Sequence, residues 1–285
     1  MIAVPKISIV TPVFNGAKYL EDTILSVIQQ GYPNLEYIII DGGSTDGSVD
    51  IIKKYESHLA YWVSEPDTGL YHAVQKGFEK STGDIMAWIN SDDMYQKGAF
   101  SIVEEIFSCF PHISWLMGIP SFYDERGRTI AINDHKKWCK AEFYLGNYQW
   151  IQQESIFWRK SLWNQAGSFV NTSLKYAGDF ELWLRFFRHA ELYTLHALLA
   201  GFRMGRQNQL SIKHIDDYHL EAKRILEDER QILPPEYLNI LMSPQNKIGL
   251  INKILNKNNR RKFVNIFNYP KEIIFDRFSQ RFVVL

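Results

Sequence analysis

The sequence has little of what marks several large protein classes. Only two cysteines, Cys109 and Cys139, occur among its 285 residues, which is too few for a disulfide framework or a thiolate metal site. No run of about 18 apolar residues is present, which excludes a membrane-spanning helix. No signal peptide follows Met1, so we expect a reducing, cytoplasmic location that still allows peripheral attachment to the membrane surface.

Net charge is also missing. Lysine and arginine together number 32, as do aspartate and glutamate. This balance argues against a partner that is a nucleic acid, because chains that bind nucleic acids normally carry a strong basic excess. The charges are nevertheless uneven along the chain: residues 246–285 hold nine basic and two acidic residues and carry +7, so residues 1–245 carry −7.

Residues 246–285 also repeat isoleucine and phenylalanine at helical spacing. A basic, aromatic-rich amphipathic segment is typical of a helix that lies on a membrane surface, here the inner face of the cytoplasmic membrane. The alternative is a pair of helices that packs on the domain itself or on a second copy of the chain in a homodimer.

The first hundred residues alternate apolar, β-branched runs with helical patterns. This alternation predicts an α/β fold with a mostly parallel central sheet flanked by helices, of Rossmann-like type. We expect strands over 6–13, 36–41, 61–64 and 84–89 and helices over 16–30, 46–55, 70–80, 99–111, 160–166, 178–189 and 212–232. Ligands of such sheets bind beyond the carboxyl ends of the strands.

At those strand ends the sequence has carboxylates in place of glycine motifs. Neither Gly-x-Gly-x-x-Gly nor Gly-x-x-x-x-Gly-Lys-Ser/Thr follows the first strand, which excludes the common dinucleotide and P-loop classes. Asp41, Asp67 and the pair Asp92 and Asp93 stand there instead. Because carboxylates repel bare phosphate, a phosphate ligand at this edge needs a divalent cation between the two.

Five strings follow one another in order over about residues 6–211. They are Thr11-Pro-Val-Phe-Asn15, Asp41-Gly-Gly-Ser-Thr-Asp-Gly47, Glu65-Pro-Asp-Thr-Gly69, Gly83-Asp84 with Asn90-Ser-Asp-Asp93, and Ala177-Gly-Asp-Phe-Glu-Leu-Trp-Leu-Arg185. Together they resemble the inverting glycosyltransferases of family two, which have the nucleotide-diphospho-sugar transferase fold of type A. Each string alone is weak, and the ordered set is specific.

The resemblance implies a nucleotide site at the strand ends. Asp41 is expected to hydrogen-bond the base, Asp92 the ribose, and Asp67 is expected to face the nucleotide. For Asp41 and Asp67 the alternative is support of their own turns. The loop expected to shape the site consists of Thr11, Pro12, Phe14 and Asn15.

The resemblance also implies a cation and a catalytic base. Asp93 is expected to hold Mn²⁺ or Mg²⁺, the alternative being an exposed loop that caps a helix. Asp179 is expected to be the base that takes the acceptor's proton. It opens a helix whose dipole favours the ionised carboxylate, and an ordinary pKa of about 3.9 would already leave it deprotonated at neutral pH. Its alternative is a plain helix-terminal charge.

Further residues are expected around the sugar and the diphosphate. Those near the donor sugar and the acceptor are Trp150, Gln152, Gln153 and Glu154. Glu154 stands where the family has Ser, and Trp150 either stacks on a sugar ring or packs in the core. Arg203 and Arg206 are expected to clamp the diphosphate. Gly205 stands where relatives carry a metal-binding His, and His214 is either its substitute or a surface histidine.

The predicted function is a metal-dependent, inverting glycosyltransferase that moves a sugar from a nucleotide-diphosphate donor, such as a UDP-sugar, to a hydroxyl of a glycan or lipid-linked glycan in cell-surface polysaccharide synthesis. The alternatives are a non-catalytic protein that binds sugar nucleotides or glycans and a sugar-1-phosphate nucleotidyltransferase. We expect a transferase domain over residues 1–211, with a nucleotide-binding half (1–98) and an acceptor half (99–211), and a helical, basic extension over 212–285.

Overall fold

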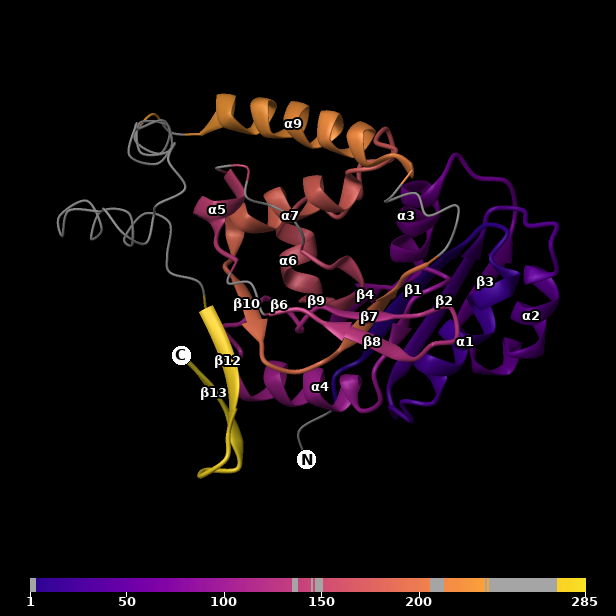
Figure 1. The fold of residues 1–285 in the computed structure, drawn as a ribbon, viewed down its shortest axis with the longest axis horizontal. Helices are drawn as coiled ribbons and strands as arrows, with labels where there is room; N and C mark the ends of the chain where they lie inside the picture. Colours follow the sequence, from indigo (N-terminus) through magenta and orange to yellow (C-terminus); the bar gives the residue numbers. More distant parts are fainter. Residues whose placement is uncertain are drawn as a thin grey trace.

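The structure, a computed structural model, describes residues 4–134, 138–144, 146, 151–205, 213–233, 235 and 271–285. Within these ranges the strands form two sheets, a nine-stranded one in the order β13-β12-β10-β6-β9-β4-β1-β2-β3 and a four-stranded one in the order β5-β11-β7-β8 (Figure 1). The strands are β1 (Ile7–Val13), β2 (Leu35–Asp41), β3 (Tyr61–Ser64), β4 (Ile85–Trp88), β5 (Met94–Tyr95), β6 (Trp115–Met117), β7 (Ser121–Tyr123), β8 (Thr129–Ile132), β9 (Ile156–Arg159), β10 (Leu192–Leu195), β11 (Ala200–Arg203), β12 (Lys271–Asp276) and β13 (Arg281–Val284).

Helices cover both faces of the larger sheet. In Figure 1, α3, α6 and α7 lie on one face and α1 and α4 on the other, while α9 runs across α7 on the outside. The helices are α1 (Ala17–Ile28), α2 (Ser48–Lys54), α3 (Leu70–Lys80), α4 (Ala99–Cys109), α5 (Lys140–Tyr144), α6 (Lys160–Gln165), α7 (Gly178–His189) and α9 (Ile215–Ile232), with short 3₁₀ turns η1 (Glu56–His58) and η2 (Gln153–Ser155).

The first four strands run parallel, and the carboxyl ends of β1, β2 and β3 are level. β1 pairs with β2 and β4, and β2 pairs with β3, all in parallel. Val13 stands opposite Asp41, which in turn stands opposite Ser64. β1 is buried along its whole length, as expected of a strand covered by helices on both faces. The α/β fold predicted from the alternating pattern is therefore confirmed.

The second half of the sheet departs from parallel order at β9. This strand runs antiparallel to both β4 and β6. Its Trp158 joins an aromatic cluster in which Trp183 of α7 stacks on Trp88 and on Trp115, at centroid distances of 5.6 and 5.8 Å. Trp183 thus packs α7 against the sheet.

The end of the chain is part of this sheet. The helix expected over 212–232 is confirmed as α9, whose Ala222 and Leu226 are buried. The helical expectation is wrong for residues 271–285, because β12 and β13 form an antiparallel hairpin and β12 pairs in parallel with β10. β-branched residues favour strands, and Asp276 closes the turn by accepting the backbone N–H groups of Phe278 and Ser279.

The hairpin is anchored by a core residue, Ile273, which is fully buried. Within the part of the chain that the structure describes, no helix is both long and apolar enough to cross a membrane. Trp150 and Arg206, and six of the nine basic residues within 246–285, lie outside the described residues.

Candidate active site

The loops after β1 and β2 are tied together by hydrogen bonds. The backbone N–H of Asn15 donates to Oγ of Ser44 (2.7 Å), and Oδ1 of Asn15 accepts from the backbone N–H of Thr45 (3.0 Å). Asn15 has a φ of +50°, a conformation that asparagine tolerates better than most residues. At the start of α1 the N–H of Ala17 donates to Oδ2 of Asp46 and not to Asn15.

Asp41 organises the turn that follows β2. Its carboxylate is fully buried. Oδ2 accepts from the backbone N–H groups of Gly43 (3.1 Å) and Ser44 (2.9 Å) and from Oγ of Ser64 (2.6 Å), while Oδ1 accepts from Oγ of Ser44 (2.5 Å). These four donors occupy about as many positions as a carboxylate offers. The contacts therefore support the turn role of Asp41 over the expected bond to the base.

Asp67 lies directly against that turn. Its Oδ1 accepts from the backbone N–H of Gly69 (2.8 Å). A Cβ added to Gly42 would lie 2.7 Å from Oδ2 of Asp67, so the glycine at this position is what lets the carboxylate approach the backbone. Asp67 is partly exposed, and it is therefore better placed than Asp41 to meet a ligand at the strand ends.

The residues of the first loop divide into buried and exposed ones. Thr11 is fully buried, with Oγ1 3.1 Å from the hydroxyl of Tyr37, and Pro12 is buried as well. Phe14, by contrast, is 67% exposed, which is unusual for so large an apolar side chain. Of the loop residues expected to shape the nucleotide site, Phe14 and Asn15 are exposed, whereas Thr11 and Pro12 are buried.

Asp93 is enclosed in the protein. Its Oδ1 accepts from the backbone N–H of Arg203 (2.9 Å), and its carbonyl oxygen accepts from Oγ1 of Thr23 (2.8 Å). Oδ2 is buried and has no hydrogen-bond partner within the described residues. Burial, reinforced by the nearby charge of Glu154, raises the pKa of Asp93 well above its usual range. Its neighbour Asp92 is partly exposed.

Arg203 binds the protein and not a ligand. Its Nε donates to the carbonyl oxygen of Asp92 (2.7 Å), and its Nη1 to that of Glu125 (3.0 Å). Its Nη2 pairs with Asp22 at 2.9 Å, and the guanidinium lies 4.6 Å from the ring centroid of Tyr19. The side chain is fully buried. Its burial and these contacts favour a structural role for Arg203 over the expected clamp on the diphosphate.

Gln152, Gln153 and Glu154 enter the same buried region through η2. Nε2 of Gln153 donates to the carbonyl oxygen of Trp88 at the end of β4 (2.6 Å), and Nε2 of Gln152 to that of Ser121 (3.2 Å). The Oε1 atoms of all three residues are buried with no hydrogen-bond partner in the described part of the chain. Burial, with repulsion from Asp179, raises the pKa of Glu154 to about 8.

Asp179 begins α7 and faces the start of α3. The hydroxyl of Tyr71 lies 2.9 Å from the carbonyl oxygen of Tyr176 and 3.2 Å from Oδ1 of Asp179, so its single proton is shared between them. A Cβ added to Gly178 would lie 2.8 Å from the ring of Tyr71. The glycine before Asp179 thus allows the tyrosine to pack against this turn of the chain.

The surroundings of Asp179 raise the pKa of its carboxyl group. Burial raises its pKa to about 6, and the charge of Glu221 adds to the rise, although the backbone N–H of Phe180 and the Tyr71 hydroxyl oppose it. The expectation of an ordinary pKa is therefore wrong, because loss of solvent outweighs the favourable helix terminus. A pKa near the working pH suits a general base.

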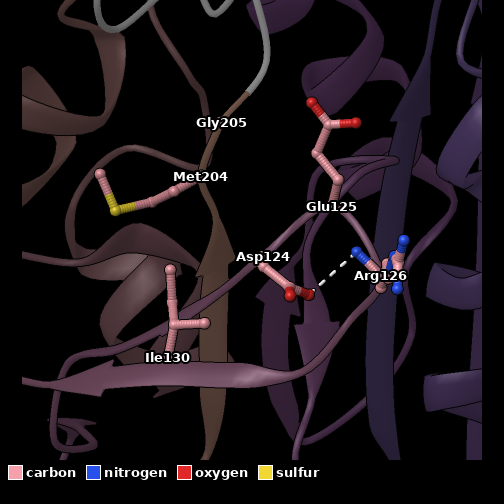
Figure 2. A pocket seen from close by; sticks show the side chains of 6 residues that line it. All are labelled: Asp124, Glu125, Arg126, Ile130, Met204 and Gly205. Atoms are coloured by element: carbon pink, nitrogen blue, oxygen red, sulfur yellow. Dashed lines mark hydrogen bonds between the residues drawn. The ribbon is translucent and has the colours of Figure 1, made fainter.

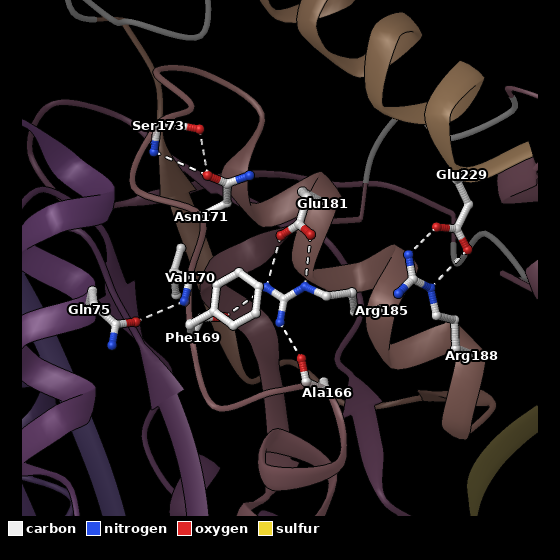
Figure 3. A network of polar contacts seen from close by, with 10 residues as sticks. All are labelled: Gln75, Ala166, Phe169, Val170, Asn171, Ser173, Glu181, Arg185, Arg188 and Glu229. Atoms are coloured by element: carbon white, nitrogen blue, oxygen red, sulfur yellow. Dashed lines mark hydrogen bonds and ion pairs between the residues drawn. The ribbon is translucent and has the colours of Figure 1, made fainter. Parts of the chain in front are cut away.

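A network behind α7 holds the helix and the loop before it (Figure 3). Arg185 pairs with Glu181, four residues earlier in α7, through two bonds of 2.8 Å, and also donates to the carbonyl oxygens of Ala166 and Phe169. Oε1 of Gln75 on α3 accepts from the backbone N–H of Val170 (2.8 Å). These contacts fix the loop between α6 and α7 on both sides.

A hollow of about 270 Å³ opens beside the site (Figure 2). Its walls come from the turn after β7, from β8 and from the end of β11: Asp124, Glu125, Arg126, Ile130, Met204 and Gly205. Glu125 is joined to the site in two ways, by its carbonyl oxygen to Arg203 and by its carboxylate to Lys18 at 3.0 Å. His214, considered either as a substitute ligand or as a surface histidine, stacks on Tyr176 and pairs with Asp217.

Two residues of the site are not apparent from the sequence. Tyr71 carries no motif, and only its place in the first turn after the Asp67–Gly69 string could have drawn attention to it. Glu221 lies in the expected extension, yet α9 brings it to the loop before Asp179. Contacts between segments so distant in sequence become visible only in the folded chain.

Comparison with solved structures shows which known proteins share this fold. The chain superposes on S. aureus TarS 1–349, solved in complex with UDP-GlcNAc, with a TM-score of 0.68 over 91% of this chain and 79% of that one, at 17% identity. It also superposes on the mannosyltransferase PcManGT of Pyrobaculum calidifontis, solved with GDP-Man and Mn²⁺, with a TM-score of 0.59 over 93% and 80% of the two chains, at 14% identity. These superpositions show that the chain shares the type A fold of the two proteins.

The sequence comparisons identify the family. Residues 8–170 match the family described as Glycosyl transferase family 2, and the chain belongs to that family. An uncharacterized glycosyltransferase of Rickettsia prowazekii is 23% identical over 222 residues, 75% of this chain and 69% of the relative. TuaG of Bacillus subtilis, named as a teichuronic acid biosynthesis glycosyltransferase, is 39% identical over 98 residues, 33% of this chain and 38% of the relative. Of the three functions considered from the sequence, the glycosyltransferase is confirmed.

Proposed function

We propose that this glycosyltransferase moves a sugar from a UDP-sugar to a hydroxyl of a glycan or lipid-linked glycan, with inversion at the sugar carbon. The observation that carries the proposal is Asp179: a partly exposed carboxylate at the start of α7, held by Tyr71, with a pKa raised to about 6. Such a group is deprotonated at neutral pH and still basic enough to accept a proton from the attacking hydroxyl.

The nucleotide is assigned to the strand ends of β1 to β4. Asp67 and Phe14 are the exposed groups there, and Asp41 supports the turn on which the nucleotide would rest. TarS, which shares the fold, was solved with UDP-GlcNAc, and PcManGT with GDP-Man. A thermal-shift screen with UDP-sugars and GDP-sugars tests whether the donor carries uracil or guanine. A ligand that binds only the folded state raises the melting temperature.

A divalent cation would suit the carboxylates at the strand ends. Within the described residues no three His, Cys, Asp or Glu side chains come together as a complete metal site, so the donor's diphosphate and water would complete the shell. The partly exposed Asp92 supplies hard oxygen atoms at this edge, and the buried Asp93 lies directly after it. Bound Mn²⁺ or Mg²⁺ would stabilise the negative charge of the departing diphosphate.

We assign the direct cation contact to Asp92 and structural support to Asp93, which reverses the roles expected from the resemblance. Asp93 is fully buried and already accepts the N–H of Arg203, whereas Asp92 reaches the surface. Calorimetry of UDP binding with and without Mn²⁺ tests this: Asp92→Asn should lose the enhancement by Mn²⁺, and Asp93→Asn should keep it. The opposite pattern would restore the original assignment.

The base assignment is tested by Asp179→Asn. We expect transfer to fall by at least about 100-fold, with Mn²⁺-dependent UDP binding unchanged. Asp216→Asn, a change in the first turn of α9 at an exposed carboxylate, is the matched control and should keep full activity. Full transfer by Asp179→Asn would overturn the proposal.

We further propose peripheral attachment to an anionic membrane surface and a role in cell-surface polysaccharide synthesis. The charge of +7 over residues 246–285 supports attachment, as does the hairpin tip, where Phe278 is fully exposed between Arg277 and Arg281. A membrane surface is where a lipid-linked acceptor would be met. The similarity to TuaG, a protein named for teichuronic acid biosynthesis, supports the polysaccharide role.

A further inference from the structure

Helix α9 holds the loop that leads into Asp179. Glu221 accepts three consecutive backbone N–H groups: Oε1 from Lys175 (3.0 Å) and Oε2 from Tyr176 (2.9 Å) and Ala177 (2.9 Å). These N–H groups precede the first turn of α7, where no intrahelical acceptor exists. One carboxylate from a distant helix therefore orders three peptide units immediately before the proposed base.

The middle of these peptide units is clamped from both sides. The carbonyl oxygen of Tyr176 accepts from the hydroxyl of Tyr71 on α3 (2.9 Å), while its N–H donates to Glu221 on α9. The ring of Tyr176 stacks on His214, just before α9, at a centroid distance of 4.9 Å. The direction of the chain at Ala177, the residue before α7, is thus set by two helices outside α7 itself.

Docking of α9 does not depend on Glu221. Near the other end of the helix, Glu229 is buried, pairs with Arg188 of α7 and accepts from the hydroxyl of Tyr144 at 2.7 Å (Figure 3 shows the ion pair). Ala222 and Leu226 are buried between these two points. Because the helix has its own anchors, the bonds made by Glu221 act on the 175–177 loop and not on the attachment of α9.

We propose that Glu221 is a positioning residue for glycosyl transfer, which fixes peptide units 175–177 and through them the direction in which the Asp179 carboxylate points. The inference rests on the proposed function of Asp179 as the base. Catalysis by a positioned base is sensitive to displacements of about 1 Å, so loosening this loop costs rate without removing any group that touches the substrate.

The charge of Glu221 also affects the proposed base, Asp179. The groups that face Asp179 are Tyr71 from α3, Glu154 from η2, Glu221 from α9 and the backbone N–H of Phe180. The negative charge of Glu221 raises the pKa of Asp179. Its neutralisation should therefore move the acid limb of the pH–rate profile to lower pH while it slows the transfer step, a combination that a purely structural residue would not produce.

The test compares Glu221→Gln with Glu227→Gln, an exposed glutamate of the same helix. For Glu221→Gln we expect kcat to fall about 10- to 100-fold, KM for the nucleotide-sugar to stay within about twofold, and the acid limb to move down in pH. Hydrogen exchange at the amides of residues 175–177 should speed up in the same variant. Glu227→Gln should change none of these readouts.

The outcomes separate this inference from the proposed base. Faster exchange at 175–177 with unchanged kcat would overturn the positioning role even if Asp179→Asn is inactive. An active Asp179→Asn variant would instead overturn the proposed function. If Glu221→Gln does not fold, Glu221→Asp, which keeps the charge on a shorter side chain, provides the same measurements. Failure of both variants to fold would also overturn the inference, since the carboxylate would then serve stability.

Discussion

The hydroxyl of Tyr71 lies 3.2 Å from Oδ1 of Asp179, although the two residues are 108 positions apart. Tyr71 stands in the first turn of α3, directly after the Asp67 turn at the strand ends, and Asp179 opens α7. This bond therefore joins α3, which follows the strand ends, to the start of α7. It also gives the proposed base a defined direction, since one of its oxygens is held.

The pH dependence of transfer should report Asp179. Only the deprotonated carboxylate takes a proton, and burial raises its pKa to about 6, so kcat/KM should rise with pH through about 6 and then level off. Tyr71→Phe should move this limb to higher pH, because the lost hydroxyl favours the ionised form. Tyr55→Phe, which removes a surface hydroxyl bonded to Glu21, is the control. If Tyr71→Phe leaves the pH dependence of kcat/KM unchanged, the Tyr71 hydroxyl does not influence the pKa of Asp179.

Gly178→Ala should disturb the contact between Tyr71 and the start of α7. The new Cβ would lie 2.8 Å from the ring of Tyr71, and relief of such overpacking costs about 1–3 kcal/mol of unfolding free energy. We expect a lower urea midpoint and about a tenfold loss of transfer. In the background of Tyr71→Leu, the same change should cost much less stability, because the smaller side chain leaves room. Equal costs in both backgrounds would contradict the contact.

Arg203 should prove to be a residue of the fold. Replacement by Met leaves the carbonyl oxygens of Asp92 and Glu125 without this donor, whereas Asp22 is about half exposed and stays solvated, so we expect a loss of about 2 kcal/mol in urea unfolding. A diphosphate clamp would behave differently, with a raised KM for the donor and unchanged stability. Arg126→Met, at the rim of the neighbouring hollow, is the control and should be as stable as the natural protein.

Membrane attachment can be tested without disturbing the sheet. Phe278→Ser combined with Arg277→Ser changes the hairpin tip, whereas removal of the whole extension would also remove the buried Ile273 of β12. In co-sedimentation with vesicles rich in anionic lipid, we expect the tip variant to bind more weakly than the natural chain. Lys223→Ser on exposed α9 removes one charge as a control. Equal binding by tip variant and natural chain would remove the hairpin from the membrane contact.

The sequence predicted the first half of the fold closely because its signals there are local. The apolar run Ile7–Val13 predicts a strand and the periodic pattern of Leu70–Lys80 predicts a helix, each without information from the rest of the chain. The family strings also led to Asp179, since a carboxylate at the start of a helix is recognisable without any long-range contact.

The errors arose where a role depends on distant partners. Arg203 looks like a phosphate ligand until Asp22, Tyr19 and Glu125 are seen around it. The helical spacing of apolar residues near the end of the chain gave no sign that Lys271–Asp276 pairs with β10. Glu221 could not be linked to Asp179 from the sequence, because only the crossing of α9 over α7 brings the two together.

The place of β12 has a consequence for how the protein is made. β10 emerges from the ribosome before α9 and all that follows, yet the strand that covers its free edge is Lys271–Asp276. Until then β10 presents unpaired backbone groups, a situation that invites pairing with other chains. Synthesis of this enzyme should therefore pass through a vulnerable interval, in which a pause or a premature stop between α9 and β12 yields an aggregation-prone product.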